Sequence, residues 1–136
     1  MKETRLRRLV CNLLKTLRLD PISVENPAYP GTPDVNYVGG WIELKALDKW
    51  PVFKKTPLRI KTFTREQRTW LWRRWRRGGQ VHLLVTVGND WLLFDGVTAA
   101  DHVGYESRAK LEVLAVECWS RAPQPADLLD ALQRRA

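Results

Sequence analysis

The 136-residue sequence has few of the side chains that build disulfide frameworks or zinc sites. It contains two cysteines, Cys11 and Cys118, and only two histidines, which is too few for either kind of site. It has no uncharged apolar run long enough to span a membrane, and it does not open with the pattern of a signal peptide. We therefore expect a protein of the reducing cytoplasm with no membrane partner.

Acidic residues are scarce in the middle third of the chain, and this scarcity concentrates the net charge of +8. Residues 41–80 carry twelve basic and three acidic side chains, a net charge of +9, against +2 for residues 1–40 and −3 for residues 81–136. A localised positive field favours phosphate polymers through counterion release and steering. The alternative is a solvated face that keeps the protein soluble. Because tryptophans are interleaved with these charges, we favour a nucleic acid as the partner.

Helical and strand patterns alternate along the chain, and we expect a single domain over residues 1–136. Its hydrophobic content of 44% is sufficient to bury a core. Residues 111–119 fit a strand or a helix equally well, since short apolar runs do not discriminate. The order predicts an α/β domain with a mixed central β-sheet flanked by α-helices. The expected elements are helices over 3–18, 64–77 and 125–135, a short strand over 22–25, a glycine-turn hairpin over 34–47 and a second hairpin over 80–96.

One expected strand, residues 41–47, carries charges that sheet stability does not require. Glu43 and Lys45 share a face about 7 Å apart, with Asp34 across the turn, where a purely structural strand favours Val or Thr. The structural alternative is a surface ion pair between Glu43 and Lys45, worth about 0–1 kcal/mol, with Asp34 capping a turn. We interpret the three residues as a site, and we expect them to lie on an exposed patch.

The segments GTPD (31–34) and ELK (43–45), with the later Gln67, resemble the PD-(D/E)xK nuclease superfamily. Within it, the sequence is most similar to the VRR-NUC (virus-type replication-repair nuclease) domains and to phage junction-resolving endonucleases. An E-x-K triplet alone is common, but the Pro-Asp turn, the acid on the first helix and the helix led by Gln67 make the pattern specific. The resemblance covers residues 3–96 and implies a restriction-endonuclease-like core, phosphodiester hydrolysis and a divalent ion, Mg²⁺ or Mn²⁺.

The resemblance also implies roles for individual residues. Asp34 and Glu43 would supply the hard oxygen ligands that Mg²⁺ prefers, and the carbonyl of Leu44 would be a further ligand. Lys45 would hold the attacking hydroxide or offset negative charge that develops on phosphorus. Packing two carboxylates together without such cations would raise a pKa and cost stability.

Two assignments stay open at this level. Glu3, at the head of the apolar stripe of the first helix, is the favoured additional metal ligand, and Glu25 is its competitor. A first-turn acid is also favoured by the helix dipole alone. Gln67 is either a fourth catalytic residue or the far half of a capping box with Thr64.

Basic side chains on the loop 48–63 and the second helix are expected to follow the DNA backbone. Exposed tryptophans would stack on unpaired bases, and Trp50 and Trp72 are the candidates for exposure. The expected nucleic-acid-binding residues are Lys49, Lys54, Lys55, Arg59, Lys61, Arg65, Arg68 and Arg73.

Together these features favour a divalent-metal-dependent DNA endonuclease that acts on branched or structured DNA in phage replication, recombination or repair. It would work in the host cytoplasm if the chain is phage-encoded, and junction resolution would require a homodimer. One alternative is an exonuclease or nicking nuclease with the same site. Another is a non-catalytic nucleic-acid-binding module that retains the fold.

Overall fold

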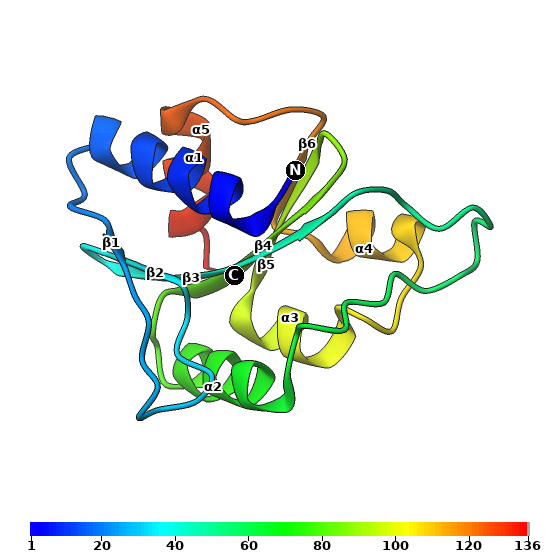
Figure 1. Ribbon diagram of the computed structural model, residues 1–136, viewed down its shortest axis with the longest axis horizontal. Helices are drawn as coiled ribbons and strands as arrows, with labels where there is room; N and C mark the ends of the chain where they lie inside the picture. The colour runs from blue at the N-terminus through cyan, green and yellow to red at the C-terminus, as the bar shows by residue number, and fades with distance from the viewer. Residues whose placement is uncertain (136) are drawn as a thin grey trace.

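The computed structural model describes residues 1–135 and places six strands in one sheet between two helical layers (Figure 1). Strand order in the sheet follows the chain from β1 to β6. Strands β3 and β4 are parallel, whereas every other neighbouring pair is antiparallel. The expected α/β domain with a mixed sheet flanked by helices is therefore confirmed. Within residues 1–135, no helix combines the length and apolar character needed to cross a membrane.

The elements that the sequence predicts lie close to their expected positions, but the helix over Gly96–His102 was not predicted. The first helix ends two residues early, and residues 111–119 divide into a helix and a strand. The strands are β1 (Ile22–Ser23), β2 (Val35–Tyr37), β3 (Gly40–Leu47), β4 (Val81–Val87), β5 (Asp90–Asp95) and β6 (Glu117–Trp119). The helices are α1 (Glu3–Thr16), α2 (Arg65–Arg76), α3 (Gly96–His102), α4 (Arg108–Leu114) and α5 (Pro125–Gln133).

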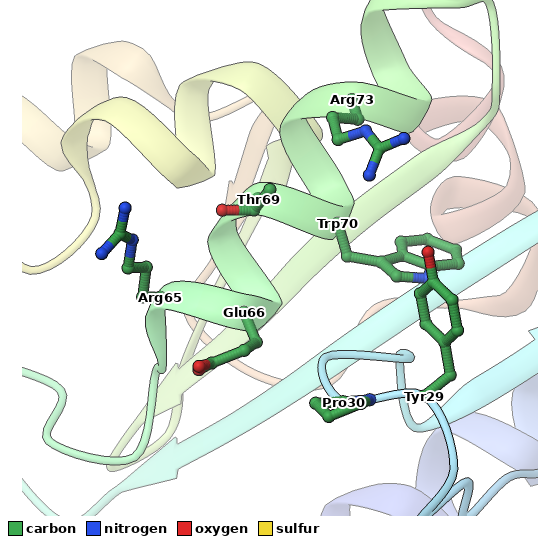
Figure 2. Close-up of a pocket in the computed structure, with 7 residues that line it drawn as sticks. All are labelled: Tyr29, Pro30, Arg65, Glu66, Thr69, Trp70 and Arg73. Carbon is green, nitrogen blue, oxygen red and sulfur yellow. The ribbon is translucent and has the colours of Figure 1, made fainter.

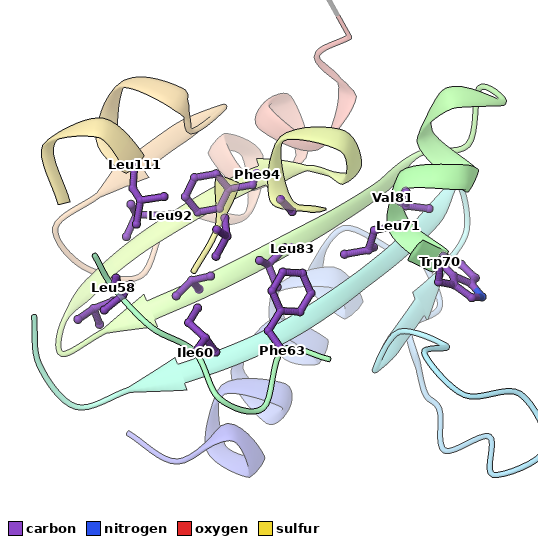
Figure 3. Close-up of a cluster of buried hydrophobic side chains, with 14 residues drawn as sticks. Leu58, Ile60, Phe63, Trp70, Leu71, Val81, Leu83, Leu92, Phe94 and Leu111 are labelled. Atoms are coloured by element: carbon purple, nitrogen blue, oxygen red, sulfur yellow. The ribbon is translucent and has the colours of Figure 1, made fainter. Parts of the chain in front are cut away.

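Two hydrophobic clusters lie on opposite faces of the sheet. Leucines and valines of α1 and α5 pack on one face against inward side chains of β2, β3 and β5. Helices α2, α3 and α4 cover the other face, where Leu83 and Phe94 lie at the centre of the cluster shown in Figure 3. The loop between β3 and α2 contributes Leu58, Ile60 and Phe63 to this second cluster, which anchors the loop to the sheet.

The β2–β3 hairpin turns at Val38 and Gly39, one residue earlier than the predicted pair of glycines. Gly39 adopts φ +115°, which favours glycine, and Tyr37 pairs with Gly40. Gly40 itself begins β3, where a Cβ atom would meet the carbonyl oxygen of Gln80. The two glycines therefore serve different purposes: the first makes the turn, and the second lets the chain approach β4.

A crossover connects β3 to β4 because parallel neighbours cannot be joined by a tight turn. Residues 48–64 form a long loop that extends away from the sheet, and α2 brings the chain back (Figure 1). The predicted capping box is confirmed at the start of α2, where Thr64 and Gln67 each accept a hydrogen bond from the other's backbone N–H. This crossover places the basic segment directly after the strand that carries Glu43 and Lys45.

Candidate metal centre

The end of the β2–β3 ladder fixes the position of Asp34. Strand β2 begins at Val35, opposite Ile42, so β3 continues beyond its antiparallel partner. The N–H of Leu44 donates to Asp34 Oδ2 at 2.9 Å. The N–H and C=O groups of a strand residue point to the same side of the strand. The Leu44 carbonyl is therefore also directed to the side of β3 on which Asp34 lies.

Three carboxylates from separate segments of the chain meet near the end of the β2–β3 ladder. One oxygen each of Glu3, Asp34 and Glu43 lies within 4.8 Å of the others, and we name these three residues the acidic cluster. Glu3 is the first residue of α1, Asp34 precedes β2, and Glu43 lies in the middle of β3. Glu43 is 1% exposed, and its Oε1 atom has no hydrogen-bond partner among the described residues.

Two cations contact the acidic cluster. Lys45 Nζ lies 3.4 Å from Glu43 Oε2 and 3.9 Å from Glu3 Oε1, and it donates to the Thr62 carbonyl at 2.8 Å. Arg7 Nη2 donates to Asp34 Oδ1 at 3.0 Å. With every group ionised, three negative and two positive charges leave a formal net charge of −1.

The expectation of an exposed patch is wrong for two of its three residues. Lys45 is 3% exposed and Glu43 is also buried, whereas the Asp34 side chain keeps 20% of its surface. The cause is tertiary: β3 is an interior strand, and the first turn of α1 and the segment at Thr62 both reach Lys45. Alanine substitution at Glu43 or Lys45 therefore removes buried atoms, contrary to the sequence-based expectation.

Burial and like charge make the acidic cluster reluctant to ionise completely. Burial, with the Asp34 carboxylate as the next cause, raises the pKa of Glu43 to about 9, although Lys45 acts in the opposite direction. Burial likewise raises the pKa of Glu3, and Lys45 partly offsets this effect. The cluster therefore either retains a proton or needs a further cation.

The donor set fits a divalent cation that prefers hard ligands. Carboxylate oxygens converge from three separate segments, and within residues 1–135 the buried Oε1 atom of Glu43 has no hydrogen-bond partner. The Leu44 carbonyl is directed to the side of β3 on which Asp34 lies. Oxygen ligands of this kind suit Mg²⁺ and Mn²⁺. Sulfur and imidazole ligands are absent from the acidic cluster, which argues against a structural zinc site.

The geometry distinguishes Glu3 from Glu25 as the additional acid and shows what the Gln67 side chain contacts. Glu3 belongs to the acidic cluster, whereas the side chain of Glu25 is 89% exposed and lies 3.9 Å from Arg7. Gln67 uses its side-chain oxygen to accept from the Thr64 N–H at 2.9 Å, so its carboxamide is committed to the start of α2.

Most of the expected DNA-binding residues are solvent-exposed. They follow the loop 48–64 and the outer face of α2, and we name them the basic surface: Lys49, Lys54, Lys55, Arg59, Lys61, Arg65 and Arg73.

Arg68 lies apart from the basic surface. Its guanidinium lies 4.2 Å from the ring centroid of Phe63 and 4.8 Å from that of Tyr105, and it donates to the Ala100 carbonyl at 3.1 Å. Burial lowers its pKa. Arg68 thus joins α2 to α3, and we leave it out of the basic surface.

Sequence reasoning missed Arg7 and the exposed aromatic residue Tyr29. The signal for Arg7 is its position four residues after Glu3, which places both on one face of α1. Tyr29 lies in a loop with no periodic pattern. Of the two tryptophans expected at the surface, Trp72 is exposed, whereas Trp50 is half-buried and donates to Asp90 at 2.8 Å.

Neither a scan against protein-family models nor a search of the curated proteins finds a match to this chain. The acidic cluster and its surroundings are therefore the basis for assigning a function.

Proposed function

We propose that this protein is a divalent-metal-dependent DNA endonuclease with a restriction-endonuclease-like core, hydrolysing phosphodiester bonds in branched or structured DNA. The observation that carries the proposal is the convergence of Glu3, Asp34 and Glu43, with Lys45 beside them. The buried Oε1 atom of Glu43 has no hydrogen-bond partner in the part of the chain that the structure describes. The position of the acidic cluster at the end of a hairpin, before a basic crossover, supports the same function.

The acidic cluster and the Leu44 carbonyl would hold one Mg²⁺ or Mn²⁺ ion. Such an ion would supply Lewis acidity toward the scissile phosphate and would lower the pKa of a coordinated water. Asp34 is kept in position by two hydrogen bonds, from Leu44 and Arg7. Lys45, whose ammonium is fixed by the Thr62 carbonyl beside the acidic cluster, would offset negative charge that develops on a phosphate held there.

A purely structural role explains these residues less well. A buried ion pair between Glu43 and Lys45 gives little or no net stability, because desolvation offsets the attraction. Adding Glu3, Asp34 and Arg7 leaves one excess negative charge around the buried Glu43, which makes the balance worse. A non-catalytic DNA-binding module has no need of three carboxylates beside its basic surface.

The first test is the metal requirement. Purified protein is incubated with labelled linear duplex, single strand, flap and four-way junction, and the products are separated on denaturing gels. We expect cleavage with Mg²⁺ or Mn²⁺, little with Ca²⁺, which tolerates looser geometry, and none in excess chelator. Internal cuts indicate an endonuclease, and stepwise loss from one end indicates the exonuclease alternative. Undiminished cleavage in chelator contradicts the metal mechanism.

The basic surface predicts a steep salt dependence of DNA binding. Each phosphate neutralised contributes about −0.9 to the slope of log K against log salt concentration on duplex DNA. Replacing Lys54 and Lys55 together with alanine is expected to make the slope shallower by up to about 2, with similar loss on every substrate. Fluorescence anisotropy in chelator measures the slope without cleavage.

The matched control removes the same charge elsewhere, with Lys15→Ala and Arg121→Ala combined. Both side chains are exposed and lie outside residues 41–80. An equal change of slope in the two double variants would mean that the basic segment is only a solvated face.

The homodimer that junction resolution requires is measured on the same purified protein by light scattering.

A further inference from the structure

A pocket of about 290 Å³ lies between α2 and the loop that precedes Asp34 (Figure 2). On the helix side it is lined by Arg65, Thr69 and Arg73, which are four residues apart and therefore share one face of α2. Tyr29 and Pro30 form the opposite wall.

The aromatic end of the pocket is rigid on one side and accessible on the other. Trp70 is buried and packs edge to face against Trp41, with ring centroids 5.5 Å apart, while Arg74 covers its ring at 4.5 Å. Tyr29 stands beside Trp70 at the pocket mouth and is 54% exposed (Figure 2). An exposed planar ring against a fixed support is suited to stacking on a flat ligand.

The polar groups of the pocket select for a ligand that carries both an anion and hydrogen-bond donors. Arg65 and Arg73 are exposed, and neither has an ion-pair partner within residues 1–135. Glu66 adds one carboxylate, which accepts hydrogen bonds from amino groups. Inorganic phosphate leaves Glu66 and the aromatic wall unused, whereas a nucleotide matches the arginines, the carboxylate and the ring together.

A short, constrained segment connects the pocket to the acidic cluster. Gly31 has φ +88°, and a Cβ atom there would meet the carbonyl oxygen of Glu66, so only glycine lets the loop lie against α2. The Thr32 hydroxyl donates to the Tyr29 carbonyl at 2.8 Å. The five residue-to-residue steps from Tyr29 to Asp34 span at most about 18 Å, which is about the length of five stacked nucleotide steps of one strand.

We propose that this pocket holds one unpaired nucleotide of a DNA strand, with its base stacked on Tyr29 and its adjacent phosphates paired with Arg65 and Arg73. The inference deepens the proposed function, because it assigns the selection of structured DNA to a base that must be unpaired to enter. A base in an intact duplex enters only at the cost of unstacking and unpairing.

The test measures binding in chelator, so that it is independent of cleavage. Wild type, Tyr29→Ala, Tyr29→Phe and Arg73→Ala are titrated against single-stranded, flap and blunt duplex DNA by anisotropy. Loss of the Tyr29 ring is expected to weaken single-strand and flap binding about 5- to 100-fold and duplex binding less than twofold. Tyr29→Phe keeps the ring and is expected to bind like wild type. Arg73→Ala is expected to weaken single-strand binding more than Arg121→Ala.

A second readout is the fluorescence of a base analogue. Single strands carrying 2-aminopurine are expected to change fluorescence on binding to wild-type protein, because the probe stacks on an aromatic ring, and Tyr29→Ala is expected to lose the change. Equal losses on all three DNAs, or unchanged binding by Tyr29→Ala, would overturn the pocket assignment. If no metal supports cleavage but the single-strand preference persists, the nuclease proposal fails and the pocket stands.

Discussion

The Glu43→Gln variant is expected to lose DNA cleavage by about 10²–10³-fold while keeping its fold and its DNA affinity. Glutamine has the shape of Glu43 but lacks its charge, and half of its oxygen ligand capacity is replaced by an NH₂ group. Preorganised groups of this kind are typically worth about that factor in turnover. Single-turnover cleavage at saturating DNA measures the loss, and anisotropy with Ca²⁺ measures binding.

The isosteric change is needed because Glu43 and Lys45 are buried. Truncating Lys45 to alanine would leave a cavity and an unbalanced carboxylate, so lost activity could reflect unfolding. Lys45→Met keeps the volume and removes the charge, and we expect it to lose turnover by a similar factor. Wild-type rates in either isosteric variant would remove that residue from the site.

Glu3 and Glu25 are the two candidates for the additional metal ligand, and substituting each in turn gives a matched comparison. Both lie close to Arg7 or its partners, but only Glu3 contributes to the acidic cluster. Glu3→Gln is expected to lower cleavage at least tenfold, and Glu25→Gln less than twofold. Equal losses would mean that both acids act only by orienting Arg7.

Local patterns were sufficient to locate most of the elements, although they missed α3 and left residues 111–119 open. The leucine periodicity of residues 3–18 located α1, the Thr64–Gln67 capping box located α2, and the glycines at 39 and 40 located the hairpin. These signals depend on neighbours within four residues, where propensity and periodicity are reliable guides. They also placed Asp34 at the start of one arm of the hairpin, just before β2, and Glu43 and Lys45 on the other arm, β3. This arrangement is a local property of one hairpin.

Properties that arise from distant parts of the chain could not be predicted. The burial of Lys45 depends on Glu3 and Thr62, which lie 42 and 17 residues away in the sequence. Arg68 looked like a phosphate ligand because basic residues surround it, yet Phe63 and Tyr105 enclose it. The Tyr29 pocket forms only because an irregular loop lies against α2. Each of these features depends on tertiary packing, which neither composition nor local sequence patterns predict.

Without metal, the free energy of unfolding is expected to fall as pH rises from about 5 to 9. The pKa of Glu43 is about 9 in the folded protein against 4.5 for an unperturbed glutamate, so the folded state binds more protons than the unfolded state between these values. This stabilisation is complete below about pH 4.5 and is lost as pH approaches 9. One proton contributes at most about 1.4 kcal/mol per pH unit.

Other charged groups around Glu43 also affect the pH dependence of stability, so the experiment compares variants. The raised pKa of Glu3 acts in the same direction, and Asp34, Arg7 and Lys45 complete the surroundings. Urea denaturation in chelator at pH 5.5 and 8 measures the difference for wild type, for Glu43→Gln, which removes the titrating group, and for Glu25→Gln as control. We expect Glu43→Gln to be more stable than wild type at pH 8, and the control to behave like wild type.

Mg²⁺ is expected to reverse the loss of stability at pH 8, because the ion and the proton compete for the same carboxylates. At 100 times its dissociation constant, an ion that binds only the folded state adds about 2.7 kcal/mol. The gain should be largest in wild type at pH 8, small at pH 5.5 and absent in Glu43→Gln. A stability that is independent of both pH and Mg²⁺ in wild type would mean that Lys45 and Arg7 already neutralise the acidic cluster. In that case the three carboxylates form a closed ion-pair network, and a metal site at this edge of the sheet is contradicted.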